Sequence, residues 1–190
     1  MYCTEDSDAL ASEVGLKSGS ALEYAGKSFI NFRDFDFEDR GKHRFRWIDT
    51  KKFELLVPEW TDWSILEALI AHAEFPDDYV GGGIDLEGLR HGPYWRARIS
   101  PETYRQIEVQ SVLDVLEGWL AGCGEIPALL ESEITRQVRD PIRAASSCYL
   151  LGELDSSASN DYADIHIEFH EFVAINRSEK SVLLIVATDD

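Results

Sequence analysis

The residues best suited to chemistry lie in one short segment, 164–171. Four potential ligands alternate there with apolar residues: Asp164, His166, Glu168 and His170. This two-residue period is typical of one face of a β-strand. His166 and His170 would lie about 13 Å apart along such a strand, too far apart to bind one metal ion. Neighbours such as His166 and Glu168 could share an ion if another segment supplied a third ligand. We expect a solvated or interface face here, with a metal-dependent or other enzyme as the alternative.

A run of glycines, Gly81–Gly83, lies in an acidic setting. A phosphate-binding loop needs backbone N–H groups at a helix start and usually a Lys or Arg. Four carboxylates surround these glycines instead and would repel phosphate: Asp77, Asp78, Asp85 and Glu87. The segment therefore predicts an acidic surface loop that could enter the basic groove of a partner.

Nucleophilic catalysis finds no motif in the chain. The pattern GxSxG does not occur, and Cys148 lies in an apolar, strand-like stretch where a thiol should stay protonated. Paired carboxylates are frequent only because acidic residues are frequent. We therefore expect no catalytic residues and no cofactor, and the leading hypothesis is not an enzyme.

Charge is the dominant feature of the composition. The 190 residues include 36 Asp and Glu against 18 Lys and Arg, a formal net charge of −18, yet 44% are hydrophobic. Such a chain can fold and carry its charge as a surface field, which attracts basic partners and repels nucleic acid and anionic membranes. The basic and aromatic stretch 40–47 superficially suggests nucleic-acid binding, but a protected edge strand explains it equally well. We expect a basic protein as the partner, and no direct contact with nucleic acid or membrane.

Aromatic residues beside acids are the best candidates for contact with such a partner. Acids would steer the encounter, and Trp and Tyr would anchor the complex. The predicted partner-binding residues are Trp60, Asp62, Trp63, Asp77, Asp78, Tyr79, Asp85 and Glu87.

The cysteines and the N-terminus indicate a cytoplasmic protein. The three cysteines are odd in number and widely spaced, which is not a disulfide framework. We find no secretory signal pattern and no apolar run of the roughly 20 residues needed to cross a bilayer. We expect a monomer or a small homo-oligomer.

The order of predicted elements indicates one α+β domain over residues 27–190, after a tail and weak helical lead-in at 1–26. Strands are predicted at 29–38, 45–57, 94–99, 148–153, 162–175 and 181–187, and helices at 62–73, 100–121, 127–139 and 141–146. The last strand is apolar on both faces and should be central. We expect a mostly antiparallel sheet of about five to six strands, with the C-terminal hairpin central and three helices on one face.

The C-terminal segment EFHEFVAINR, residues 168–177, with the apolar run that follows it, resembles the C-termini of small uncharacterised bacterial proteins. The whole chain resembles bacterial toxin-immunity proteins as a class: compact, acidic and without a catalytic motif. The leading hypothesis is therefore an immunity or inhibitor protein that occludes a basic toxin such as a nuclease. A DNA-mimic inhibitor of a DNA-binding enzyme is an alternative, and it would need carboxylates spaced like phosphates.

Overall fold

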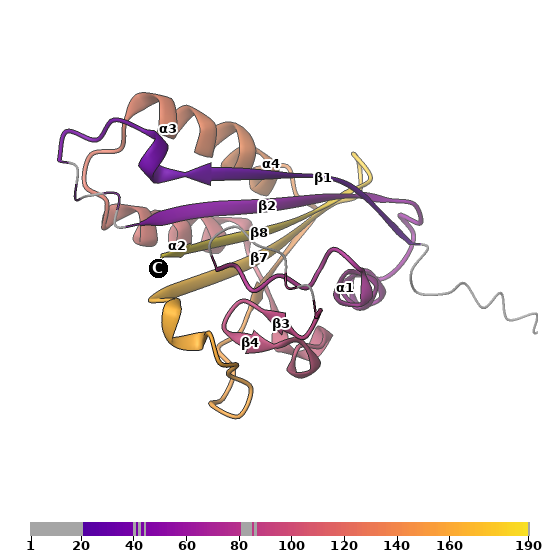
Figure 1. Cartoon of the computed structure of the whole chain (residues 1–190). Helices are drawn as coiled ribbons and strands as arrows, with labels where there is room; N and C mark the ends of the chain where they lie inside the picture. The colour runs from indigo at the N-terminus through magenta and orange to yellow at the C-terminus, as the bar shows by residue number, and fades with distance from the viewer. Residues whose placement is uncertain are drawn as a thin grey trace, which may run out of the picture.

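A computed structural model describes residues 21–39, 41, 43, 45–80, 85 and 87–189. Six antiparallel strands form one sheet in the order β1-β2-β8-β7-β6-β5 (Figure 1). Their bounds are β1 Leu22–Asn31, β2 Arg46–Leu55, β5 Tyr104–Ile107, β6 Ser147–Leu151, β7 Glu168–Asn176 and β8 Ser181–Asp189. A small separate hairpin pairs β3 Arg90–His91 with β4 Tyr94–Trp95. The α+β class and the mostly antiparallel sheet are confirmed.

The C-terminal hairpin is central, as the sequence predicts. β7 and β8 pair along their whole length, and β2 pairs with the other edge of β8. Alternate residues of β8 enter two different cores: Val182 and Leu184 face one, and Ile185 and Ala187 face the other. Because both parities of this strand are apolar, both faces of the sheet need a covering layer.

Three helices cover one face. They are α2 Val109–Ala121, α3 Ala128–Ile134 and α4 Asp140–Arg143, and a π-helical turn at Thr135–Arg139 joins the last two. Their apolar residues pack with Phe172 and Ile185 of the central strands into the larger core. Arg139 is buried at this joint and forms ion pairs with Glu117 at 2.7 Å and Glu131 at 2.6 Å. These pairs fasten α3 and the π-helical turn to α2.

The opposite face is covered by α1, Asp62–Ala71, and by the segment 75–99, which contains β3 and β4 (Figure 1). Ile65, Leu66 and Leu69 of α1 are buried against Phe53 of β2 in a second core. Thr61 caps α1 by accepting a hydrogen bond from the Ser64 N–H. The sequence predicts this helix, but the expectation that helices cover only one face is wrong, because α1 lies on the other side of the sheet from the other three.

The N-terminal boundary differs from the prediction. Residues 1–20 lie outside the described residues, but β1 begins at Leu22, so 22–26 form a strand and not the end of a helical lead-in. β1 also ends at Asn31, where a strand to 38 was expected, and its bulge lies between Tyr24 and Gly26. Gly26 has a φ of +137°. A glycine at the bulge permits this backbone conformation, which is why the bulge is there.

The segment 94–109 is more broken than predicted. β4 ends at Trp95, where a strand to Ile99 was expected. Ser100–Pro101 starts only a single 3-10 turn, because β5 follows at Tyr104 and pairs with β6. α2 begins at Val109. A capping signal provides hydrogen-bond partners for the free N–H groups in the first turn of a helix. It does not determine whether the helix continues beyond that turn.

Two further boundaries differ. Asp140–Pro141 does not end the preceding helix, because the π-helical turn passes directly into α4. The strand predicted at 162–175 starts only at Glu168, after a 3-10 turn at Ala163–Ile165. Within the described residues no helix is long and apolar enough to span a membrane.

Candidate partner-binding site

Asp77 is a structural residue and not an exposed partner contact. Its carboxylate is buried and lies 2.9 Å from the Lys51 ammonium and 3.2 Å from that of Lys27. Lys27 also lies 2.7 Å from buried Asp49, and Lys51 donates to the Glu74 carbonyl. These two lysines and two aspartates fasten the chain after α1 to β1 and β2. The prediction that Asp77 contacts a partner is therefore wrong, because its charge is neutralised inside the protein.

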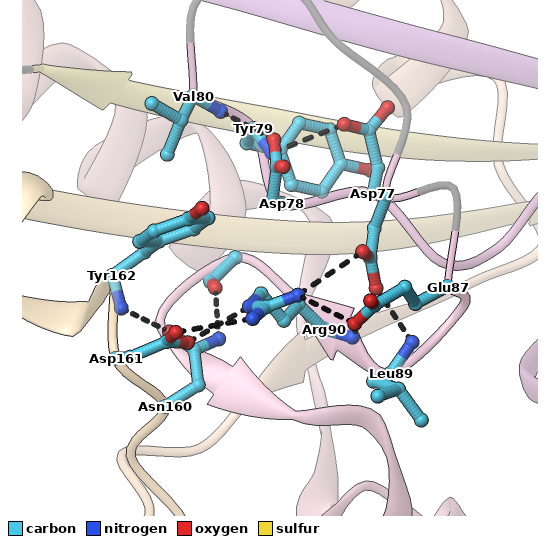
Figure 2. Close-up of polar contacts among 12 residues, drawn as sticks. Asp77, Asp78, Tyr79, Val80, Glu87, Leu89, Arg90, Asn160, Asp161 and Tyr162 are labelled. Carbon is cyan, nitrogen blue, oxygen red and sulfur yellow. Dashed lines mark hydrogen bonds and ion pairs between the residues drawn. The ribbon is translucent and has the colours of Figure 1, made fainter.

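Tyr79 is also buried and cannot act as an exposed anchor. Its ring packs against Trp47, His91 and Phe169, and the Lys51 ammonium lies 5.2 Å from the ring centroid. The φ of Tyr79 is +54°, a conformation that non-glycine residues rarely adopt. The Asp77 carboxylate holds it by accepting a 3.0 Å bond from the Tyr79 N–H (Figure 2). Burial raises the pKa of the Tyr79 phenol well above 10.0. Tyr79 is predicted as a surface anchor because acidic residues precede it. Acidic neighbours in the sequence do not show whether a side chain is exposed, and this one belongs to the core.

A second buried polar group lies under the same segment. His91 Nε2 is 2.6 Å from Glu171 Oε2, the Tyr104 hydroxyl donates to the other Glu171 oxygen, and His91 Nδ1 is 2.7 Å from the Phe75 carbonyl. A carbonyl only accepts hydrogen bonds, so Nδ1 carries a proton. The short contact to Glu171 links the β3–β4 hairpin to β7. All three side chains are buried.

Asp85 organises the turn that leads to β3. It is buried, and it accepts hydrogen bonds from the backbone N–H groups of Leu89 and Arg90. Arg90 binds Asp161 through two hydrogen bonds of 2.8 and 3.0 Å and lies 3.3 Å from Asp85 and 3.6 Å from Glu87 (Figure 2). Asp85 is therefore structural, whereas Glu87 remains exposed at this site.

The three predicted residues near α1 divide in the same way. Asp62 accepts hydrogen bonds from Arg177, Ser147 and Tyr149 and so joins α1 to the sheet. Trp60 is half-buried and packs against the second core. Of these three residues, Trp63 alone is exposed. Of the eight predicted partner residues, those that remain accessible are Trp63, Asp78 and Glu87, with Trp60 accessible in part.

The four potential metal ligands do not come together. His166 is buried, with Nδ1 3.2 Å from Thr188 Oγ1 and Nε2 3.1 Å from the Asp78 carbonyl. Asp164 lies in the 3-10 turn before β7, and His170 is 3.4 Å from Glu168. The described residues, which include all four, hold no group of three or more side chains that could bind a metal ion. The expected strand face is broken here because β7 starts only at Glu168.

Two further predictions on chemistry concern Cys148 and the basic stretch 40–47. Burial raises the pKa of the Cys148 thiol to about 11, so it stays protonated as predicted. Arg46 is buried and donates to the Trp119 carbonyl of α2, so it is not part of an exposed basic surface. Arg40, Lys42, Arg44 and Gly81–Gly83 lie outside the described residues.

The sequence reasoning missed one surface, which we call the acidic–apolar patch. It consists of Asp78, Asp164, Ile165, Ile167 and Glu168. Ile167 is 73% exposed and Ile165 is 38% exposed, while His166 between them points inward to Asp78. The hydrogen bond from His166 thus places Asp78 beside the turn that carries the two isoleucines. The alternation of Ile and His was visible in the sequence, but a regular strand would have buried the apolar residues and exposed the histidine.

The electrostatics of this patch are negative. Among the described lysines and arginines, Arg46 pairs with Glu168 at 3.9 Å, but its guanidinium is itself buried. Arg90 lies farther along the same surface and is occupied by Asp161, Asp85 and Glu87 (Figure 2). One carboxylate oxygen of Asp78 accepts a hydrogen bond from the Val80 N–H. Asp164 has no hydrogen-bond partner among the described residues. The patch therefore offers apolar area with carboxylates beside it.

Comparisons with known proteins leave the family open. No protein-family model and no curated protein matches the chain. Among solved structures, the crystal structure of citrus MAF1 is similar, with a TM-score of 0.40 and 12% identity, covering 83% of this chain and 92% of that chain. A similarity of this size carries no argument about function.

Proposed function

We propose that this protein is an acidic protein-binding domain that occludes a basic partner, as an immunity or inhibitor protein occludes a toxin such as a nuclease. The observation that carries the proposal is the exposure of Ile165 and Ile167 among carboxylates in the acidic–apolar patch. Burying one such isoleucine in a complex would contribute about 1.5–3 kcal/mol. An exposed apolar pair rimmed by charges is the usual composition of an interface centre and its edge.

The charge of the chain supports a basic partner over a neutral one. A net charge of −18 produces a field that accelerates capture of a cation-rich surface. The rigid fastening of the neighbouring segment by Asp77 and Arg90 reduces the ordering cost of binding, because Asp78 is already held in place. Carboxylates would thus guide the encounter, and the two isoleucines would supply the contact energy.

A recovered partner tests this function. The tagged protein is used to isolate its partner from the native cell, and binding of the purified partner is then measured by surface plasmon resonance. We expect a basic partner whose association slows when NaCl is raised from about 50 to about 500 mM, because the Debye length shortens several-fold. An acidic partner, or a salt-independent association rate, would contradict the proposal.

Two matched variants locate the interface. Ile167→Lys places a cation in the patch and should weaken binding by about tenfold or more. Leu129→Lys makes the same charge change at a 76% exposed leucine of α3, away from the patch, and should bind like the unmodified protein. Equal affinities for the two variants would show that the partner does not dock on this patch.

A further inference from the structure

A groove of about 600 Å³ lies on the helical side of the sheet, within the size range of small-molecule sites. The sheet forms its floor with residues of β1, β2, β7 and β8, and the π-helical turn and α4 form its wall. It lies on the opposite face of the sheet from α1 and the segment 75–99. A ligand here would therefore bind independently of a protein on the acidic–apolar patch.

Two backbone irregularities shape this groove. The bulge of β1 places Gly26 in the lining, and a Cβ added at Gly26 would meet no atom within 4 Å. The π-helical turn brings Arg136 and Gln137 to the opposite wall. Bulges and π-helical turns are both frequent beside functional sites. The groove is thus bordered on two sides by the least regular parts of the sheet and of the helical layer.

Two hydrogen-bond donors line the groove and are not used within the described residues. Thr50 and Asn176 are each 5% exposed. The Thr50 hydroxyl bonds to no described residue. Asn176 Oδ1 accepts from the Ser178 hydroxyl at 2.7 Å and from the Glu179 N–H at 3.0 Å, but its Nδ2 has no partner among the described residues. Both donors are therefore available to a group in the groove that accepts hydrogen bonds.

Three cations and two acids line the groove: Lys27, Lys52 and Arg136, with Asp140 and Glu179. Lys52 lines it and has no ion-pair partner among the described residues. Arg136 also lines it, beside Glu133 at 2.6 Å. Of the two acids in the lining, Asp140 is 3.0 Å from Arg143, and Glu179 is exposed in the turn between β7 and β8. The two lining groups without an ion-pair partner among the described residues are therefore Lys52 and Glu179, and Lys52 lies on the same face of β2 as Thr50.

We propose that this groove binds a small anionic molecule through a carboxylate or phosphate group. Lys52 would pair with the charge, and the Thr50 hydroxyl and the Asn176 amide would donate to its oxygens. Gly26 leaves room for the body of the ligand between β1 and the π-helical turn.

Nuclear magnetic resonance of the ¹⁵N-labelled protein tests this site, with inorganic phosphate and succinate as separate probes. We expect one probe or both to shift amide signals near Gly26, Thr50 and Asn176, and the stronger probe identifies the anion class. Thr50→Val and Lys52→Gln should each weaken binding by about tenfold. Arg105→Gln removes an exposed cation at the opposite edge of the sheet and should change nothing.

The proposal fails if neither probe shifts groove signals, or if Lys52→Gln and Arg105→Gln bind alike. The amide spectrum of each variant reports at the same time whether it is folded. If Thr50→Val binds both probes as the unmodified protein does, the Thr50 hydroxyl contacts only water and the assigned site is wrong.

Discussion

At the scale of single residues, the carboxylates of this protein divide into two groups by the donors around them. Asp77, Asp85 and Glu171 are buried and meet lysine, arginine, histidine or backbone donors, so they hold segments together. Asp78 and Asp164 keep most of their hydrogen-bonding capacity for solvent or a partner. Net charge alone therefore overstates the number of acids that can attract another protein.

Asp62 should make a pH-dependent contribution to stability. Partial burial acts to raise its pKa, but hydrogen bonds from Ser147, Arg177 and Tyr149 outweigh this and hold the pKa below the ordinary 3.8. The pKa of Asp62 is therefore lower in the folded chain than in the unfolded chain. The stabilisation by its ionised carboxylate is fully present above about pH 4 and is lost as the pH falls through the pKa of the folded chain. Asp62→Asn should therefore cost about 1–2 kcal/mol at pH 7.

Urea unfolding of the Asp62→Asn variant and the unmodified protein checks this at pH 7 and in strongly acidic solution. The two free energies of unfolding should differ at pH 7 and converge at low pH. Asp164→Asn changes an exposed carboxylate of the patch and serves as the control with no change expected. If the difference in free energy of unfolding between Asp62→Asn and the unmodified protein stayed constant with pH, the stabilisation would not come from the ionised form of Asp62.

At the scale of elements, the β3–β4 hairpin lies against the sheet because one residue of its turn has no side chain. Gly92 has a φ of +52°, and a Cβ at this position would clash with the ring of Phe169 on β7. The Gly92 N–H also donates to the Asp77 carbonyl at 2.8 Å. The hairpin, the lysine–aspartate cluster and β7 are thus connected at a single position.

Gly92→Ala should destabilise the protein by about 2–3 kcal/mol, through the unfavourable φ and the displaced Phe169 ring. Gly118→Ala is the matched substitution, because Gly118 lies in α2 with no atom within 4 Å of an added Cβ. It should stabilise by up to about 1 kcal/mol. Urea unfolding of both variants gives the comparison. Equal effects would show that contact with Phe169 does not restrict this turn.

The elements that follow from periodicity were predictable, and those that depend on distant contacts were not. β8 was placed centrally because residues 182–187 are apolar on both faces, and the pairing confirms it. β5 was missed because its exposed residues Arg105 and Gln106 give a weak alternation, and the strand is stabilised by pairing with β6. The burial of Tyr79 depends on Lys51 and His91, which are far from it in sequence. No local pattern encodes these partners.

At the scale of the whole molecule, the excess of negative charge opposes compactness. The formal charge of −18 is distributed over 190 residues, and folding brings the exposed carboxylates closer together. Salt weakens this repulsion, since the Debye length falls from about 30 Å at 0.01 M to about 8 Å at 0.15 M. The protein should therefore be more stable at physiological ionic strength than in dilute buffer.

Thermal unfolding at these two salt concentrations measures the effect. We expect the melting temperature to rise by several degrees, the equivalent of about 1 kcal/mol for a chain of this size. A variant with three exposed acids neutralised, Glu125→Gln, Glu153→Gln and Asp164→Asn, should show a smaller rise. A melting temperature that falls with salt would mean that attractive ion pairs, such as those of Arg139 and Arg90, outweigh the repulsion.

The Glu171 carboxylate on β7 is a shared acceptor for two separate parts of the chain. Its two oxygens meet the His91 ring of the β3–β4 hairpin and the Tyr104 hydroxyl of β5. A substitution at Glu171 would leave both of these buried polar groups without their partner. Loss of one carboxylate would thus weaken the attachment of the hairpin and of the edge strand together.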